Sequence, residues 1–211
     1  LIVAHHPLLF HGRKRITDAD YTGRCLLKAI GGGVAIYAAH TNLDNAPGGV
    51  NFEMARRLGL QRVEVLKPKE EMLLKLVTYV PRAEAEKVRE ALFAAGCGTT
   101  GGGYDCCSFV AEGMGTFRPG PGTHPYCGRR GELHGEPEVR IETILPAYLQ
   151  GGAEAALRAA HPYEVSAYDF YRLAQGWAGA GSGVVGVLPE PVPAEDFLQK
   201  VKEVFAVPCL R

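Results

Sequence analysis

The first third of the chain alternates short apolar runs with amphipathic stretches. Uninterrupted apolar runs predict strands that are buried on both faces, and apolar residues at every third or fourth position predict helices. These patterns predict strands over 1–4, 34–39 and 62–66 and helices over 18–30 and 50–60. Thr17 or Asp18 is expected to cap the first helix, and glycines 31–33 to end it. The first strand–helix–strand unit should be right-handed, with parallel strands that end at one sheet edge.

A charged segment at 67–72 is expected to connect two domains, and the pattern of apolar and polar residues changes after it. A Gly- and Pro-rich segment at 118–137 predicts a long loop. The other patterns predict a strand over 73–81, a helix over 82–96, a hairpin with a Gly-rich turn over 104–120, a strand over 138–146, a helix over 150–162 and a strand over 163–173. This β-α-β-β-α-β order is typical of a ferredoxin-like sandwich.

After about residue 174 the pattern returns to alternating α/β. It predicts a strand over 182–190, a helix over 193–205 and the start of another strand at 207–211. The expected fold class is therefore α/β, with a mixed or parallel sheet formed by residues 1–70 and 174–211. A ferredoxin-like α+β sandwich over 71–173 is expected to be inserted into it. Because both chain ends fall inside strand patterns, the α/β domain is expected to be incomplete.

Composition narrows the class of protein mainly by exclusion. The chain is 46% hydrophobic and 22% charged, which is typical of soluble globular proteins. Lys plus Arg and Asp plus Glu balance at 23 each, which disfavours nucleic-acid binding. Its apolar runs are much shorter than the roughly 18 residues of a membrane span. The six cysteines form no C-x-x-C pair, which favours reduced thiols and a cytoplasmic location.

Histidines follow both of the first two predicted strands. His5 and His6 come directly after the first strand, and His40 comes after the second, four residues before Asp44. Ligands of parallel sheets bind beyond the carboxyl ends of the strands, so these side chains are expected at one crevice. Imidazole and carboxylate ligands suit Zn, Mn, Fe, Co or Ni. Neighbouring strand residues point to opposite sides, so His5 and His6 would each serve a different ion; otherwise they are ordinary polar residues at a strand end.

Three weaker candidates have simpler interpretations. Glycines 48–49 precede the second predicted helix and indicate either an anion-binding site at the helix N-terminus or a plain loop-to-helix turn. Residues 161–164 (HPYE) are favoured as a structural turn before the last sandwich strand rather than a site. His124, Cys127 and His134 fit no common zinc spacing and are interpreted as loop residues.

Several segments resemble a known family. LIVAHHPLLFHG, AIYAAHTNLDNAPGGVN and LGL resemble the Nif-three-like proteins, which are hexamers with a dinuclear metal centre and are named homologues of a type-two GTP cyclohydrolase I. GTFRPGPGTHPYCGRRGELHGEPEVRIETILP and AAHPYEVSAYDFY resemble the inserted PII/CutA-like domain of the longer bacterial members. The resemblance covers essentially the whole chain.

The resemblance implies roles for particular residues. His5 and His6 would each bind one of two divalent metal ions, and Asp44 would be a further ligand. His40 would contact those ligands or the substrate. The family also uses a G-H-x-x-x-E-like segment and a W-D-N-x-G-like motif, and this sequence contains neither. The chain is therefore expected to be an internal fragment with part of the ligand set.

Two classes of function follow from the resemblance. The first is a metal-dependent hydrolase of a nucleotide-like substrate, related to GTP cyclohydrolase. The alternative is a non-catalytic metal-binding oligomer with a scaffold or regulatory role. The PII-like insert favours self-association as a trimer, within the hexamer of the family. Membrane and nucleic-acid partners are not expected.

Overall fold

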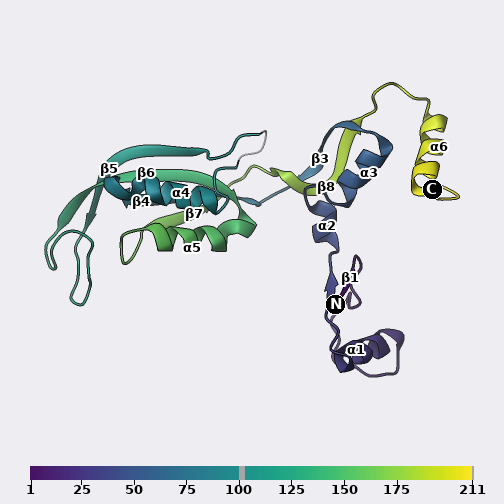
Figure 1. Cartoon of the computed structure of the whole chain (residues 1–211), viewed down its shortest axis with the longest axis horizontal. Helices are drawn as coiled ribbons and strands as arrows, with labels where there is room; N and C mark the ends of the chain where they lie inside the picture. Colours follow the sequence, from purple (N-terminus) through teal and green to yellow (C-terminus); the bar gives the residue numbers. More distant parts are fainter. Residues whose placement is uncertain (100–102, 211) are drawn as a thin grey trace. The chain divides into compact units, whose positions relative to one another are not determined.

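The computed structural model describes residues 1–99 and 103–210. The chain forms two compact units, one of Leu1–Pro68 with Gly179–Arg211, and one of Lys69–Ala178. We call them the split unit and the central unit, because the sequence of the second interrupts that of the first. Figure 1 labels their helices and strands.

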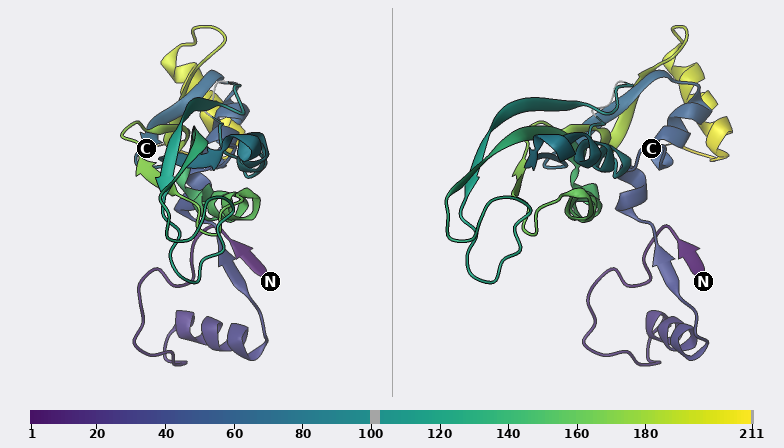
Figure 2. Two further views of the ribbon diagram at one scale, coloured as in Figure 1. Left: turned by 90° about the vertical axis from the view of Figure 1, so that its left-hand side faces the viewer. Right: turned by 60° about the vertical axis from the view of Figure 1, so that its left-hand side comes forward.

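The central unit is a four-stranded sheet with two helices. Its elements are β4 (Leu73–Pro81), α4 (Ala85–Ala94), β5 (Ser108–Phe117), β6 (His134–Pro146), α5 (Gln150–Ala160) and β7 (Tyr168–Arg172), with short 3-10 turns at Arg82–Glu84 and Ala147–Leu149. The strand order is β5-β6-β4-β7, and every neighbouring pair is antiparallel. Helices α4 and α5 lie beside each other against the sheet (Figures 1 and 2). This order and topology confirm the predicted ferredoxin-like sandwich.

The core of the central unit lies between its sheet and its helices. Helix residues four positions apart face inward, and alternate residues of the strands meet them. The core contains Leu76, Val80, Val88, Leu92, Ile141, Leu145, Ala153 and Leu157. Each large side chain buried there contributes about 1.5–3 kcal/mol relative to exposure.

Two predictions in the central unit are wrong. The hairpin expected over 104–120 is instead one continuous strand over Ser108–Phe117, which pairs with β6 along its whole length. Gly115 does not form a turn, because it lies against the Glu138 side chain, and a Cβ there would collide with that carboxylate. The expected loop over 118–137 ends earlier, since His134 already pairs with Phe117 at the start of β6.

The first part of the split unit is a strand–helix–strand segment. Strand β1 (Ile2–Ala4) pairs in parallel with β2 (Ile36–Ala38), and α1 (Tyr21–Gly31) connects them, so the predicted parallel pairing is confirmed. Asp20, rather than Thr17 or Asp18, caps α1, because its carboxylate accepts a hydrogen bond from the Gly23 amide at 2.7 Å.

Burial of the first strand differs from the prediction. Ile2 is 50% exposed and Val3 is 67% exposed, whereas the uninterrupted apolar run predicts burial on both faces. The physical reason is that β1 and β2 form a sheet of only two strands within the part of the chain that the structure describes. Such a sheet lacks the flanking layers that bury the strands of a larger parallel sheet.

The rest of the split unit is built around a second pair of strands. Two helices, α2 (Thr41–Asn45) and α3 (Val50–Leu58), lead to β3 (Gln61–Lys69), which pairs with β8 (Trp177–Val187). Helix α6 (Ala194–Phe205) follows, and the strand expected at 207–211 is not found over 207–210; Arg211 lies outside the described residues. Across the described ranges, every helix is too short or too polar to cross a membrane.

Candidate metal centre

The parallel pairing of β1 and β2 brings their carboxyl ends to one edge. His5 and His6 follow β1 directly. His40 is the residue before α2, and its imidazole makes no capping hydrogen bond there. The Ala39 amide donates to the Ala4 carbonyl oxygen at 2.8 Å, so the pairing continues to the residues that precede the histidines.

The structure brings all four residues of the predicted site together. The ring centroids of His5 and His6 are 4.8 Å apart, and those of His5 and His40 are 5.5 Å apart. The His6 and His40 centroids are 5.3 Å apart. Asp44 Oδ1 lies 3.5 Å from His5 Nε2. Three imidazoles and a carboxylate therefore converge, although the chain supplies them from two separate segments.

One nitrogen in this cluster has no protein partner. His5 Nδ1 is buried and makes no hydrogen bond to any residue that the structure describes. Leaving a buried polar atom unpaired costs about 1–3 kcal/mol. His5 Nε2, on the other side of the ring, faces Asp44. Imidazole nitrogens and a carboxylate are donors that divalent cations bind, so the residues present fit a metal ion.

Asp44 is held by a residue that the sequence analysis missed. Asn51 Nδ2, near the start of α3, donates to the Asp44 carbonyl oxygen at 2.7 Å. Gly49 permits this arrangement, because a Cβ there would collide with the Leu43 carbonyl oxygen. An asparagine just inside a helix that follows two glycines is the sequence signal that points to this contact.

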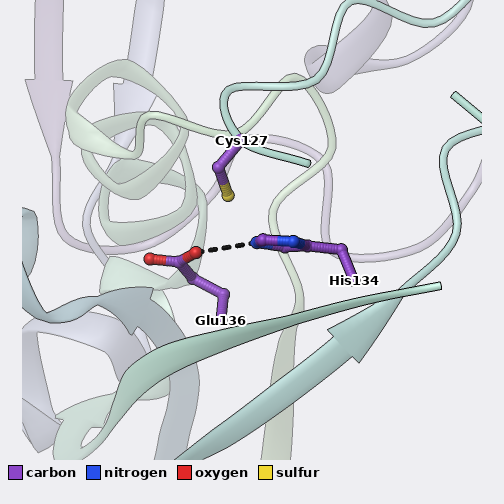
Figure 3. A group of neighbouring side chains, drawn as sticks. All are labelled: Cys127, His134 and Glu136. Atoms are coloured by element: carbon purple, nitrogen blue, oxygen red, sulfur yellow. Dashed lines mark hydrogen bonds and ion pairs between the residues drawn. The ribbon is translucent and has the colours of Figure 1, made fainter. Parts of the chain in front are cut away.

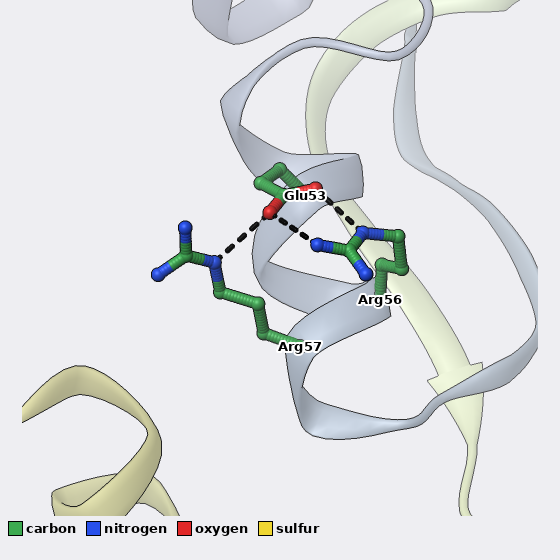
Figure 4. A network of polar contacts seen from close by, with 3 residues as sticks. All are labelled: Glu53, Arg56 and Arg57. Atoms are coloured by element: carbon green, nitrogen blue, oxygen red, sulfur yellow. Dashed lines mark hydrogen bonds and ion pairs between the residues drawn. The ribbon is translucent and has the colours of Figure 1, made fainter.

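Glycines 48–49 are explained by chain packing. Gly49 precedes α3, and the close approach to Leu43 requires a residue without a side chain. In the first turn of the helix, Glu53 binds both Arg56 and Arg57, with contacts of 2.7–2.9 Å (Figure 4). Hydrogen bonds from Arg56 and Arg57 lower the pKa of Glu53 to about 2. These observations favour a loop-to-helix turn, with the two arginines already paired.

His161 is a structural residue of the central unit. Its Nε2 lies 2.9 Å from the Tyr79 carbonyl oxygen, and its Nδ1 accepts from the Tyr163 amide at 3.1 Å. This pattern requires a neutral ring with its proton on Nε2. Burial lowers the pKa of His161, which favours the same neutral form. The interpretation of 161–164 as a structural turn therefore agrees with the geometry.

A second group of potential ligands lies in the central unit. Donor atoms of Cys127, His134 and Glu136 all lie within 4.8 Å of one another (Figure 3). The interpretation as a loop residue is therefore wrong for His134, which begins β6. Cys127 does lie in the loop, and the loop returns it to His134. His124 does not join them; its Nδ1 lies 3.4 Å from Arg130.

Comparison with known proteins identifies the family. The sequence profile of Duf34/NIF3 (NGG1p interacting factor 3) matches residues 1–211. The chain belongs to the Duf34/NIF3 family. This match confirms the resemblance to the Nif-three-like proteins that the segments LIVAHHPLLFHG and AIYAAHTNLDNAPGGVN indicated.

Relatives of this Duf34/NIF3 chain share one name. The "GTP cyclohydrolase 1 type 2 homolog" of Halalkalibacterium halodurans is 46% identical over 213 residues, covering 100% of the chain and 57% of the relative. That of Bacillus subtilis is 43% identical over 204 residues, covering 96% and 54%. A solved Bacillus cereus protein related to NIF3 superimposes with a TM-score of 0.81 at 44% identity, covering 100% and 56%. The Duf34/NIF3 chain thus spans a little over half the length of these relatives.

Proposed function

We propose that this chain contributes to a dinuclear divalent-metal centre in a metal-dependent hydrolase that acts on a nucleotide-like substrate. The observation that carries the proposal is the convergence of His5, His6, His40 and Asp44 beyond two parallel strands. The name shared by the relatives, GTP cyclohydrolase 1 type 2 homolog, supports GTP as the first substrate to test.

The chain's own residues would have separate tasks. His5 and His6 would each bind one ion of a pair of Zn, Mn, Fe, Co or Ni, and Asp44 would be a further ligand beside His5. His40 lies against both rings, so it would limit their rotation or contact the substrate. A pair of divalent ions supplies a water of lowered pKa and a positive charge for the reacting oxygens.

A second function is a metal-binding oligomer without turnover. The central unit favours this alternative, because its ferredoxin-like topology is that of the PII and CutA trimers that the sequence resembles. In this proposal the protein self-associates in the cytoplasm, and its metal site serves assembly or regulation. Both functions require the same ligands, so turnover distinguishes them.

The experiment begins with metal content. We expect His5→Ala, His6→Ala and Asp44→Ala to lower the metal bound per chain, whereas His11→Ala should leave it unchanged. His11 is a matched control, since it contacts Phe10 and is not among the converging residues. Unchanged metal in all three site variants would refute the site.

Activity is tested next on the intact gene product, with GTP loss measured with and without a chelator. Turnover that the chelator abolishes supports the hydrolase. Full metal occupancy without turnover of any nucleotide would refute the hydrolase and favour the oligomeric scaffold.

A further inference from the structure

Three side chains of the central unit present the ligand types that zinc prefers. Cys127, His134 and Glu136 offer a sulfur, a ring nitrogen and a carboxylate oxygen, all within 4.8 Å of one another. In four-coordinate zinc sites these donors are about 3–4 Å apart, given bonds of roughly 2.0–2.3 Å. We propose that these residues form a zinc site, separate from the predicted dinuclear centre.

The fold positions the three residues by simple rules. His134 and Glu136 are two positions apart on β6, so both side chains leave the same face of the strand. Their side chains already meet, with His134 Nε2 at 2.9 Å from Glu136 Oε2 (Figure 3). Cys127 comes from the loop over 118–133, which brings its sulfur to this pair.

Glycine makes the return of the loop possible. Gly128 has a φ of +79°, and a Cβ there would lie 2.8 Å from His134 Cγ. Gly131, with a φ of +81°, donates from its amide to the Pro119 carbonyl oxygen at 2.8 Å. The backbone next to Cys127 therefore packs directly on the imidazole, and any side chain at position 128 would separate them.

Negative charge gathers around the sulfur. Tyr163 Oη lies 3.9 Å from Cys127 Sγ and donates to Glu138 Oε1 at 2.7 Å. Within the described ranges, neither Glu136 nor Glu138 has a Lys or Arg ion-pair partner. A cation is the group that this arrangement lacks.

The donor set selects the metal. A thiolate with an imidazole suits Zn²⁺, whereas Mg²⁺ and Ca²⁺ prefer oxygen ligands alone. Three protein ligands leave one coordination position for water or another ligand. The ion would tie the loop over 118–133 to β6, near a cavity of about 490 Å³ that Phe117 and Tyr163 line.

Cobalt provides a direct test on the whole chain. A cobalt–thiolate bond gives a charge-transfer absorption in the near ultraviolet, which a site of histidines and carboxylates cannot give. We expect this band in the unaltered chain, its displacement by Zn²⁺ and its loss in Cys127→Ser. His134→Ala and Glu136→Gln should weaken Co²⁺ binding by at least the roughly 10–100-fold that loss of an outer-sphere partner causes.

Cys25→Ser is the matched control. Cys25 and His6 line the same cavity in the split unit, so a cobalt–thiolate band from that region would vanish in this variant. The band should survive both Cys25→Ser and His5→Ala. Absence of the band in the unaltered chain, or its persistence in Cys127→Ser, overturns the proposal.

Limited proteolysis gives a second readout. Arg129 and Arg130 are exposed in the loop beside Cys127. Zn²⁺ should slow tryptic cleavage there in the unaltered chain but not in Cys127→Ser, with circular dichroism establishing that both are folded. Equal cleavage of the unaltered chain with and without Zn²⁺ would contradict the proposal that zinc holds the loop over 118–133 against β6.

Discussion

The central unit and the split unit differ in where they keep their apolar side chains. Within residues 1–99 and 103–210, all buried hydrophobic residues except Ala55 and Ala180 belong to the central unit. Both units expose some apolar residues, such as Val165 in the central unit at 84% and Val3 and Ile30 in the split unit at 67% each. The predicted dinuclear ligands lie on the unit with little core of its own. The main hydrophobic core and the predicted dinuclear site are therefore located in different parts of the chain.

Two histidines show the same contrast. His161, in the central unit, uses both ring nitrogens in hydrogen bonds to the backbone. His5, in the split unit, has a buried Nδ1 without a described partner. The first ring is part of the framework, whereas the second has a ring nitrogen that no described residue pairs with. The partners of the two ring nitrogens show this difference.

The largest expected effect is loss of core volume in the central unit. Leu76 is fully buried, so Leu76→Ala should lower the free energy of unfolding by about 2–5 kcal/mol. Val3→Ala, at a residue 67% exposed, should change it by less than about 0.5 kcal/mol. Denaturant unfolding followed by circular dichroism measures both variants. Equal losses of unfolding free energy would contradict the conclusion that the main core lies in the central unit.

A smaller loss is expected where a buried carboxylate loses its donor. Glu138 is 9% exposed and accepts from the Tyr163 hydroxyl at 2.7 Å. Tyr163→Phe should destabilise the central unit by about 1–3 kcal/mol. Tyr104→Phe is the control, because Tyr104 is 74% exposed. Thermal unfolding distinguishes them, and an unaffected Tyr163→Phe variant would show that water replaces the hydroxyl.

The hydrogen bond between Asn51 and Asp44 in the split unit should contribute less to stability than the bond between Tyr163 and Glu138, but more to metal binding. Asn51→Ala removes the hydrogen bond to the Asp44 carbonyl oxygen, which is worth about 0.5–1.5 kcal/mol. We expect weaker metal binding, measured by calorimetric titration, with little change in the unfolding of the central unit. Asn42→Ala, at an exposed position in α2, should change neither. Equal metal affinity in the two variants would exclude a positioning role for Asn51.

The smallest effect concerns the pH dependence of the central unit. Burial lowers the pKa of His161 below its ordinary value of 6.5, although the Tyr79 carbonyl and Glu138 oppose this. The unfolded chain then binds more protons just below pH 6.5, so the contribution of His161 is complete above 6.5 and declines as the pH falls. His161→Gln should flatten this part of the stability profile. A slope that persists in the variant must come from other groups.

Strong periodicity was sufficient to predict the central sandwich. Strand β4 has the predicted bounds, Leu73–Pro81, and α5 lies within its predicted range. The prediction failed where glycine has a packing role, because Gly115 resembles a turn residue until the Glu138 carboxylate beside it is known. The five-residue helix α2 was missed, since so short a segment has no periodicity to detect.

The two ligand clusters differ in how far the sequence could predict them. Parallel pairing of the first two strands is a local rule, and it was enough to place His5, His6, His40 and Asp44 at one edge. The Cys127 cluster depends on the starting residue of β6 and on the path of an irregular loop. Neither of these has a periodic signal, so the cluster becomes visible only in three dimensions.

The pairing of β3 with β8 has an evolutionary consequence. These two strands lead into and out of the central unit, and Gly181 lies so close to the Lys67 carbonyl oxygen that a Cβ would collide with it. A gene segment encoding residues 69–178 could therefore be acquired, exchanged or deleted as a cassette while the flanking strands stay joined.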